Sequence, residues 1–189
     1  RSKKHDKAVN QNLTGGQQPS SEGIMVDLNY CVKESQKAAA KYGLTIIPGS
    51  EITRSGTYVG HFNALFTTDN NLIYDPDPVK AIRNAKAQGA LVMHNHPGWR
   101  KKNVAMTKTD KVAYKEGLID GVEVMNFYEF YPGITDRGRE RNLFIAANTD
   151  IHASTAEDFN REEYMRPITL IFASERTEAG LKEALNSCR

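Results

Sequence analysis

The chain has 189 residues, of which 39% are hydrophobic and 25% are charged. These values are typical of a globular domain and exclude the collagen-like, coiled-coil and disordered classes. The 25 Lys and Arg residues nearly balance the 23 Asp and Glu residues, so charge gives no argument for nucleic acid or an anionic membrane as partner. No run of about 18 apolar residues occurs, and the sequence therefore predicts no membrane span.

The beginning of the chain differs in composition from the rest. Residues 1–25 are polar and rich in Gly, Gln and Ser, which predicts a flexible N-terminal arm or loop. From residue 26 the apolar pattern becomes regular, so we expect one domain over residues 26–189. The chain also lacks an initiator Met, which favours a polypeptide that begins partway through a longer protein.

Within residues 26–189, helical spacing alternates with short apolar runs. In chain order the sequence predicts a helix over 28–42, a strand over 44–47, a strand or hairpin arm over 58–67, a helix over 77–89, a strand over 90–93, a helix over 108–118, a strand over 121–125, a short helix over 133–141, a strand over 143–147, a loop over 148–167, a strand over 168–172 and a final helix that carries Leu181, Ala184, Leu185 and Cys188. Asp77 and Pro78 are a favourable start for a helix, and Gly43 and Gly89 are favourable ends.

The five strands over 44–47, 90–93, 121–125, 143–147 and 168–172 are apolar throughout. Strands of this kind that alternate with helices are typical of a parallel sheet covered by helices. The predicted fold class is therefore α/β. An open doubly wound sheet and a (β/α) barrel both fit the alternation.

Residues that can bind metals lie just after or beside these strands. Parallel strands end at one face of such a fold, so we expect these side chains to converge there. They are Glu51 and Arg54, His61, His94 and His96, and Asp150 and His152. Imidazole and carboxylate are the groups that bind Zn, Mn or Fe. Their repetition at successive strand ends predicts a metal centre.

Each residue also has a structural interpretation. His94 or His96 fits a buried histidine bonded to the backbone, Glu51 fits a solvated loop carboxylate, and Asp150 fits a helix N-cap. Glu123 points out of an apolar strand and needs a partner or a metal; we favour a role in orienting a metal ligand.

Five motifs follow one another along the chain: Gly-Ser-Glu-Ile-Thr-Arg at 49–54, Gly-His-Phe-Asn-Ala at 60–64, His-Asn-His-Pro-Gly-Trp at 94–99, Gly-Val-Glu-Val-Met-Asn at 121–126 and Thr-Asp-Ile-His at 149–152. As a set they resemble the successive motifs of the phosphoesterases of the PHP (polymerase and histidinol phosphatase) family. The resemblance implies a distorted (β/α)7 barrel with two or three divalent metal ions (Zn, Mn or Fe) at its mouth. The first two motifs of the family are absent from this chain, so we expect the barrel here to lack its first two strands.

The resemblance also implies roles for individual residues. Glu51, His61, His96, Asp150 and His152 would be metal ligands, with Glu51 bridging two ions. His94 would be a pocket residue. We further expect Asp150 or His94 to assist proton transfer, and Arg54 or Arg100 to bind the phosphate of the substrate.

The function that these features predict is hydrolysis of phosphate esters by a metal-activated water. Two alternatives are an amidohydrolase-like cleavage of a C–N bond and a non-catalytic PHP-like binding module or fragment. We expect a small phosphorylated substrate, and the modest net charge argues against long nucleic acid. Both an exported, periplasmic location and a cytoplasmic one fit the sequence.

Overall fold

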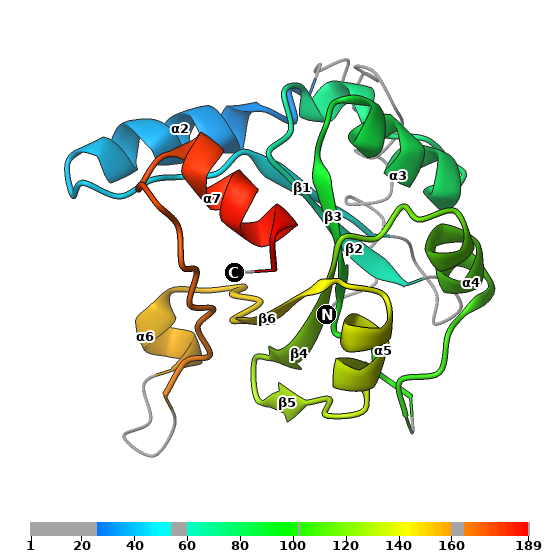
Figure 1. Ribbon diagram of the computed structural model, residues 1–189. Coiled ribbons are helices and arrows are strands. Elements are labelled where there is room, and N and C mark those ends of the chain that lie inside the picture. Colours follow the sequence, from blue (N-terminus) through cyan, green and yellow to red (C-terminus); the bar gives the residue numbers. More distant parts are fainter. Residues whose placement is uncertain (1–25, 54–59, 102, 160–164, 189) are drawn as a thin grey trace.

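The computed structural model describes residues 26–53, 60–101, 103–159 and 165–188 (Figure 1). The N-terminal arm expected over residues 1–25 lies outside these ranges. The strands are β1 (Gly49–Ile52), β2 (His61–Leu65), β3 (Leu91–Asn95), β4 (Gly121–Asn126), β5 (Glu129–Phe130) and β6 (Phe144–Asn148). The helices are α2 (Tyr30–Ala40), the 3-10 turn η1 (Asn70–Leu72), α3 (Pro78–Ala87), α4 (Lys108–Lys115), α5 (Ile134–Glu140), α6 (Thr155–Asp158) and α7 (Glu178–Asn186).

The six strands form one mixed sheet. β1, β2 and β3 pair antiparallel in sequence order, and β4 then pairs parallel with β3 on one side and with β6 on the other. β5 is a short antiparallel return strand against the end of β4. The parallel arrangement is confirmed for the predicted strands over 90–93, 121–125 and 143–147, which are β3, β4 and β6. β1 and β2, which were not among the strands predicted to be parallel, pair antiparallel.

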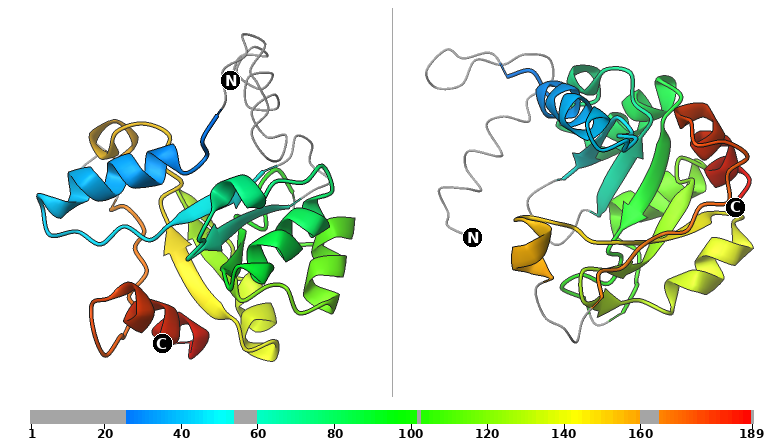
Figure 2. Two further views of the ribbon diagram at one scale, coloured as in Figure 1. Left: turned by 90° about the horizontal axis from the view of Figure 1, so that it is seen from above. Right: turned by 90° about the vertical axis from the view of Figure 1, so that its left-hand side faces the viewer.

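The larger core lies between the sheet and α3, α4 and α5 (Figure 2). Phe62 of β2, Val92 of β3 and Val122 of β4 are fully buried against the apolar faces of these helices. Because side chains alternate along a strand, the even-numbered residues of β2 and β3 face this layer and the odd-numbered ones face the other side. On that other side lies a smaller core, in which Leu91 and Met93 pack against α7.

The helix ends follow the expected local chemistry. The Asp77 side chain accepts hydrogen bonds from the N–H groups of Val79 and Lys80 at the start of α3, where Pro78 occupies the first turn. Gly43 and Gly89 follow α2 and α3 with φ of 60° and 78°, which glycine adopts at little cost. The predicted helices are thus all present. The first four are shorter than their predictions, and Cys188, which was expected on the last helix, lies beyond the end of α7.

Two predicted strands are absent from the described residues. Residues 44–47 pair with no strand, Leu44 is 59% exposed, and the first strand begins only after Pro48. Ile46 and Ile47 instead line a cavity beneath α2. An apolar run becomes a strand only when a neighbouring strand supplies hydrogen bonds to its backbone, and these residues have no such neighbour in the described chain.

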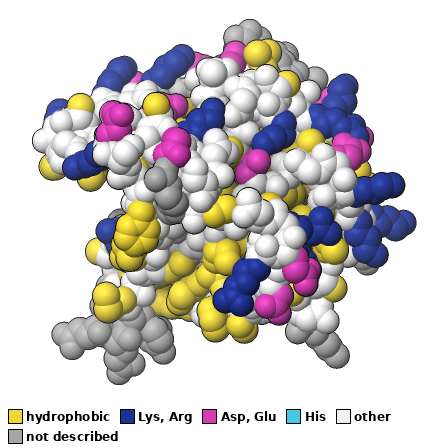
Figure 3. All heavy atoms as spheres, in the orientation of Figure 1, with side chains coloured by type: hydrophobic (Ala, Val, Ile, Leu, Met, Phe, Trp, Pro, Cys, Tyr) yellow, Lys and Arg dark blue, Asp and Glu magenta, His cyan; other side chains and the backbone are white. Residues whose placement is uncertain are grey.

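Residues 168–172 were expected to form a buried strand, which is also wrong. Ile168, Leu170 and Phe172 are 60%, 72% and 73% exposed. The segment is held to β6 by a side chain, because the hydroxyl of Thr169 accepts the Ala147 N–H and donates to the Ala147 carbonyl. On the face of the molecule that is seen in the orientation of Figure 1, hydrophobic side chains gather in the lower half (Figure 3).

The fold is therefore an α/β sheet with helices on both faces. In the described residues β1 and β6 each pair with one strand only, so the sheet is open there. No described helix is both long and apolar enough to cross a membrane.

Candidate metal centre

Three potential metal ligands converge from neighbouring strands. Glu51 lies on β1, His61 begins β2, and His96 directly follows β3. The β1–β2 register pairs Glu51 with Asn63, two residues from His61, so Glu51 and His61 share one face of the sheet. One potential ligand atom from each of Glu51, His61 and His96 lies within 4.8 Å of those of the other two.

The protonation states of this cluster suit a metal ion. Burial alone would raise the pKa of Glu51, but hydrogen bonds from His61 and Thr53 and the nearby imidazoles outweigh it and lower that pKa to about 2. His61 Nδ1 lies 3.1 Å from Glu51 Oε1. Burial and the neighbouring His61 lower the pKa of His96, against the charges of Asp150 and Glu51. An ionised carboxylate and a neutral imidazole are the forms that bind metals.

A nearby amide gives a second indication that a metal fits. Asn95 stands opposite His61 in the β2–β3 register and is 5% exposed. Its buried Oδ1 has no hydrogen-bond partner among the described residues. A buried carbonyl oxygen without a partner is costly unless an ion or water satisfies it. Two imidazoles and a carboxylate are ligands that suit Zn, Mn or Fe.

Glu123 fixes the chain at His96. Its side chain is 1% exposed, and Oε2 accepts the His96 backbone N–H at 2.5 Å and the Asn126 amide at 2.9 Å. Oε1 accepts the Asn148 amide at 2.8 Å. The carboxyl therefore joins the ends of β3, β4 and β6. This geometry agrees with the role that we expected for Glu123, which is to orient a ligand.

The turn after His96 packs an aromatic ring onto both histidines. Trp99 is half-buried, and its ring centroid lies 5.3 Å from that of His61 and 5.4 Å from that of His96. The Arg100 guanidinium lies over the same indole at 4.3 Å. No role for Trp99 at the metal centre was predicted, although Trp99 ends the His-Asn-His-Pro-Gly-Trp motif at 94–99.

Of the other predicted ligands, Asp150 and His152 lie outside the 4.8 Å cluster. His152 is exposed, and its Nδ1 approaches the Asp150 backbone carbonyl at 2.6 Å. Asp150 has a φ of 49° in the turn after β6, and its charge affects the pKa values of His96 and Glu123. Asp150 is therefore near the centre, while its ligand role remains a prediction.

His94 lies on the opposite face of the sheet. Its ring stacks on Phe62, Nδ1 is 3.0 Å from the Tyr114 hydroxyl, and Nε2 is 3.7 Å from Asp110 Oδ1. It is 1% exposed, and burial, opposed by Asp110, lowers its pKa to about 4. His94 thus packs between the sheet and α4 rather than in the pocket, a geometry that does not support proton transfer at the metal centre.

Arg54 and Arg100 are the two arginines that were predicted to bind the phosphate. Arg54 lies outside the described residues. Arg100 is exposed, and its guanidinium stacks on Trp99, whose ring in turn packs on His61 and His96. Contact of Arg100 with a phosphate remains a prediction.

Comparison with solved structures supports the resemblance found in the motifs. The chain is similar to a two-domain protein from Bacteroides vulgatus that contains a predicted PHP-like metal-dependent phosphoesterase, with 34% identity and a TM-score of 0.82 over 93% of this chain. It spans about half of that protein, 53% of its length. A Bifidobacterium adolescentis structure matches 78% of this chain and 80% of its own at 16% identity and a TM-score of 0.48, which is too weak to support an argument. No protein-family model and no curated protein matches the sequence.

Proposed function

We propose that this chain is part of a metal-dependent phosphoesterase of the PHP family, and that its sheet is part of a PHP-type barrel. The observation that carries the proposal is the convergence of Glu51, His61 and His96 within 4.8 Å. The likeness to the B. vulgatus protein, at 34% identity, supports the same assignment. We further propose two or three divalent ions, with Asp150 and His152 as additional ligands.

In this proposal the residues of the chain hold the ions and the phosphate. When bound, divalent ions supply Lewis acidity, which lowers the pKa of water and offsets charge on phosphoryl oxygens. Arg100, held over Trp99, contacts the phosphate with its guanidinium. The water oxygen forms a bond to phosphorus, the ester P–O bond breaks, and a proton passes to the departing alcohol, with Asp150 as the group that assists it.

Metal content and hydrolysis, measured on the same samples, test the proposal. Protein purified without chelator should contain Zn, Mn or Fe and hydrolyse phosphomonoesters in preference to phosphodiesters or amides. Glu51→Ala should lose most of the metal and at least a hundredfold in activity. Glu140→Ala, which removes an exposed carboxylate of α5, is the matched control and should change neither. Wild-type metal content in the Glu51→Ala protein would contradict the assignment of the site.

A non-catalytic binding module is the second candidate. It is favoured by the position of Asp150 and His152 outside the 4.8 Å cluster. Stoichiometric metal without turnover of any ester in the panel would select this candidate over the enzyme. Preferential turnover of the amides would instead select C–N hydrolysis.

A further inference from the structure

A cavity of about 310 Å³ adjoins the metal centre beneath α2. The cavity is open to solvent: residues of β1 and β2 form its floor, and Cys31, Val32 and Ser35 of α2 form one wall, which we call the roof. Glu51 belongs both to its lining and to the metal cluster. Among the described residues, Glu51 is the one that the two share, because His61 and His96 do not line the cavity.

The alternation of the strands places this cavity on the side of the sheet that carries the ligands. Glu51 pairs with Asn63, and Leu65 follows on the same face of β2 as Asn63 and His61. Glu51, Asn63 and Leu65 all line the cavity. The opposite face, with Phe62, is closed by the main core. The cavity and the metal ligands thus face the same way.

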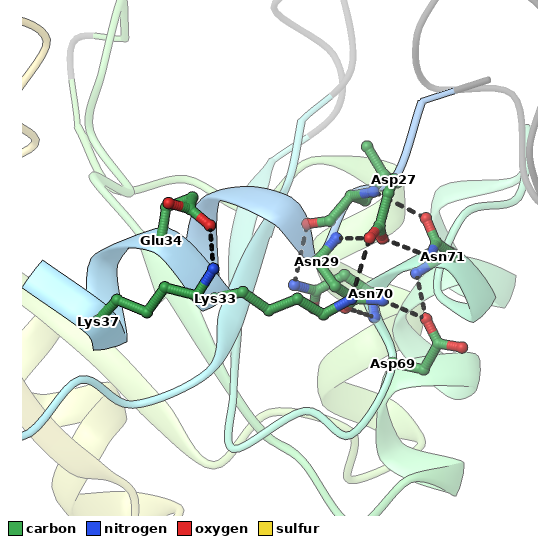
Figure 4. A network of polar contacts seen from close by, with 9 residues as sticks. Asp27, Asn29, Lys33, Glu34, Lys37, Asp69, Asn70 and Asn71 are labelled. Atoms are coloured by element: carbon green, nitrogen blue, oxygen red, sulfur yellow. Dashed lines mark hydrogen bonds and ion pairs between the residues drawn. The ribbon is translucent and has the colours of Figure 1, made fainter. Parts of the chain in front are cut away.

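The roof is held in place by a polar network at the start of α2 (Figure 4). The side-chain NH2 group of Asn29 donates to the Asp69 carboxylate at 2.8 Å. The side-chain oxygen of Asn29 accepts a hydrogen bond from the Asn70 backbone N–H at 2.8 Å. The Asn70 amide in turn donates to the Gly49 carbonyl of β1 at 3.0 Å. The network ties the start of α2 to the first residue of β1 and so fixes this end of the helix relative to the strand.

The chemistry of the lining selects what can enter. Among the described residues that line the cavity, Glu51 is the only charged one. The remaining side chains combine apolar groups, such as Val32 and Ile46, with uncharged polar groups, such as Ser35 and Asn63. Such a lining favours an uncharged group with apolar and hydroxyl parts and disfavours a second phosphate.

The positively charged Arg100 lies near the metal centre but outside the cavity lining. Arg100 stands over Trp99, which packs on His61 and His96 from the turn after β3. A phosphate ester is charged at its phosphate end and neutral at its alcohol end. In the same way, the turn with Arg100 carries the positive charge of the site, and the cavity has a largely uncharged lining.

We infer that the cavity beneath α2 binds the alcohol part of the substrate, and that the substrates are monoesters of small, uncharged, partly apolar alcohols. This inference rests on the proposed phosphoesterase function for the ester, but the binding of the alcohol can be tested without turnover. The volume of about 310 Å³ lies near the lower limit of small-molecule pockets, which span roughly 300–1,000 Å³. A nucleoside therefore fits less well than a single ring or a short chain.

Cys31 reports on occupancy, because it lines the cavity and its thiol is free. In a Cys188→Ser background it is the one cysteine of the chain. Benzyl alcohol, the probe, should slow alkylation of Cys31 by iodoacetamide at least threefold, while inorganic phosphate should not. Val32→Phe, which fills the cavity, should abolish the protection, and Gln36→Phe, on the same helix outside the lining, should keep it.

The kinetic arm uses benzyl phosphate and AMP as substrates. Val32→Phe should raise KM for benzyl phosphate at least tenfold and leave both the metal content and inhibition by inorganic phosphate unchanged. Ser35→Phe is the second variant, to be used if Val32→Phe fails to fold. It narrows the cavity from an exposed position of α2.

The two proposals fail in different ways. If benzyl alcohol protects Cys31 and Val32→Phe abolishes this protection, the cavity site is supported even when no ester is hydrolysed. The absence of hydrolysis would then contradict only the phosphoesterase proposal. Hydrolysis without protection, or an equal KM for benzyl phosphate in wild type and Val32→Phe, overturns the cavity site and leaves the enzyme assignment intact.

Discussion

Replacement of Glu123 by Gln tests the buried carboxyl that joins three strand ends. The two side chains have the same shape, and a Gln oxygen directed at His96 retains the bonds from the His96 N–H and the Asn126 amide. The new NH2 group then faces the Asn148 amide. Rotation of that amide by half a turn presents its oxygen instead, so the variant keeps all three contacts.

The size of the effect follows from the pKa of Glu123. Burial raises this pKa from 4.5 to about 7, although hydrogen bonds from His96, Asn148 and Asn126 lower it. Below pH 4.5 the carboxyl is protonated in both the folded and the unfolded chain. Between pH 4.5 and 7 only the unfolded chain gives up the proton, so the free energy of unfolding falls as pH rises. At roughly 1.4 kcal/mol per unit, the loss is about 3 kcal/mol above pH 7.

Urea unfolding of chelator-treated protein at pH 5 and pH 8 measures this loss. The stability of Glu123→Gln relative to wild type should increase by about 2 to 3 kcal/mol between pH 5 and pH 8. Other titrating groups, including His94, cancel in the difference between the two proteins. Glu140→Gln, at an exposed site, should show no such dependence. A difference between wild type and Glu123→Gln that is the same at both pH values would refute the reasoning.

Two further predictions concern the metal centre and the core. Trp99 is the one tryptophan of the chain, and its ring packs on two proposed ligands. Its fluorescence should therefore be quenched as Mn²⁺ or Co²⁺ binds, and unchanged emission in samples with stoichiometric metal by elemental analysis would exclude the site. Phe62→Ala should cost about 3–5 kcal/mol of stability in urea unfolding because Phe62 is fully buried in the main core. Phe172→Ala, at a 73% exposed position, should stay within about 0.5 kcal/mol, and equal losses would show that the core is misplaced.

The helices were predictable because their signals are local. The cap of α3 depends on Asp77, Pro78 and the two N–H groups that follow, all within one turn of chain. Capping and 3.6-residue periodicity need no information about distant segments. The same holds for Gly43, whose left-handed φ of 60° ends the stretch after α2.

The strands were predictable only in part, because a strand requires a partner that the run itself does not specify. Residues 90–93 and 44–47 are similar apolar runs, yet the first lies mostly within β3, between β2 and β4, and the second pairs with nothing in the described chain. At 168–172 the alternating exposure of a strand is present, but one Thr169 side chain takes the place of a hydrogen-bonded ladder. Pairing is a long-range property, and neither composition nor period contains it.

The candidate site shows the same limit in its two histidines. His94 and His96 are two residues apart, and in an unbroken strand both would face α4, since side chains repeat every second residue. The strand ends at Asn95, however, and His96 has a φ of 24°, with its N–H held by Glu123. This break in period turns His96 to the face of Glu51 and His61, while His94 stays with Phe62 and Tyr114. The sequence identified the residue types and the strand ends correctly, but the local backbone conformation decides which histidine belongs to the metal centre.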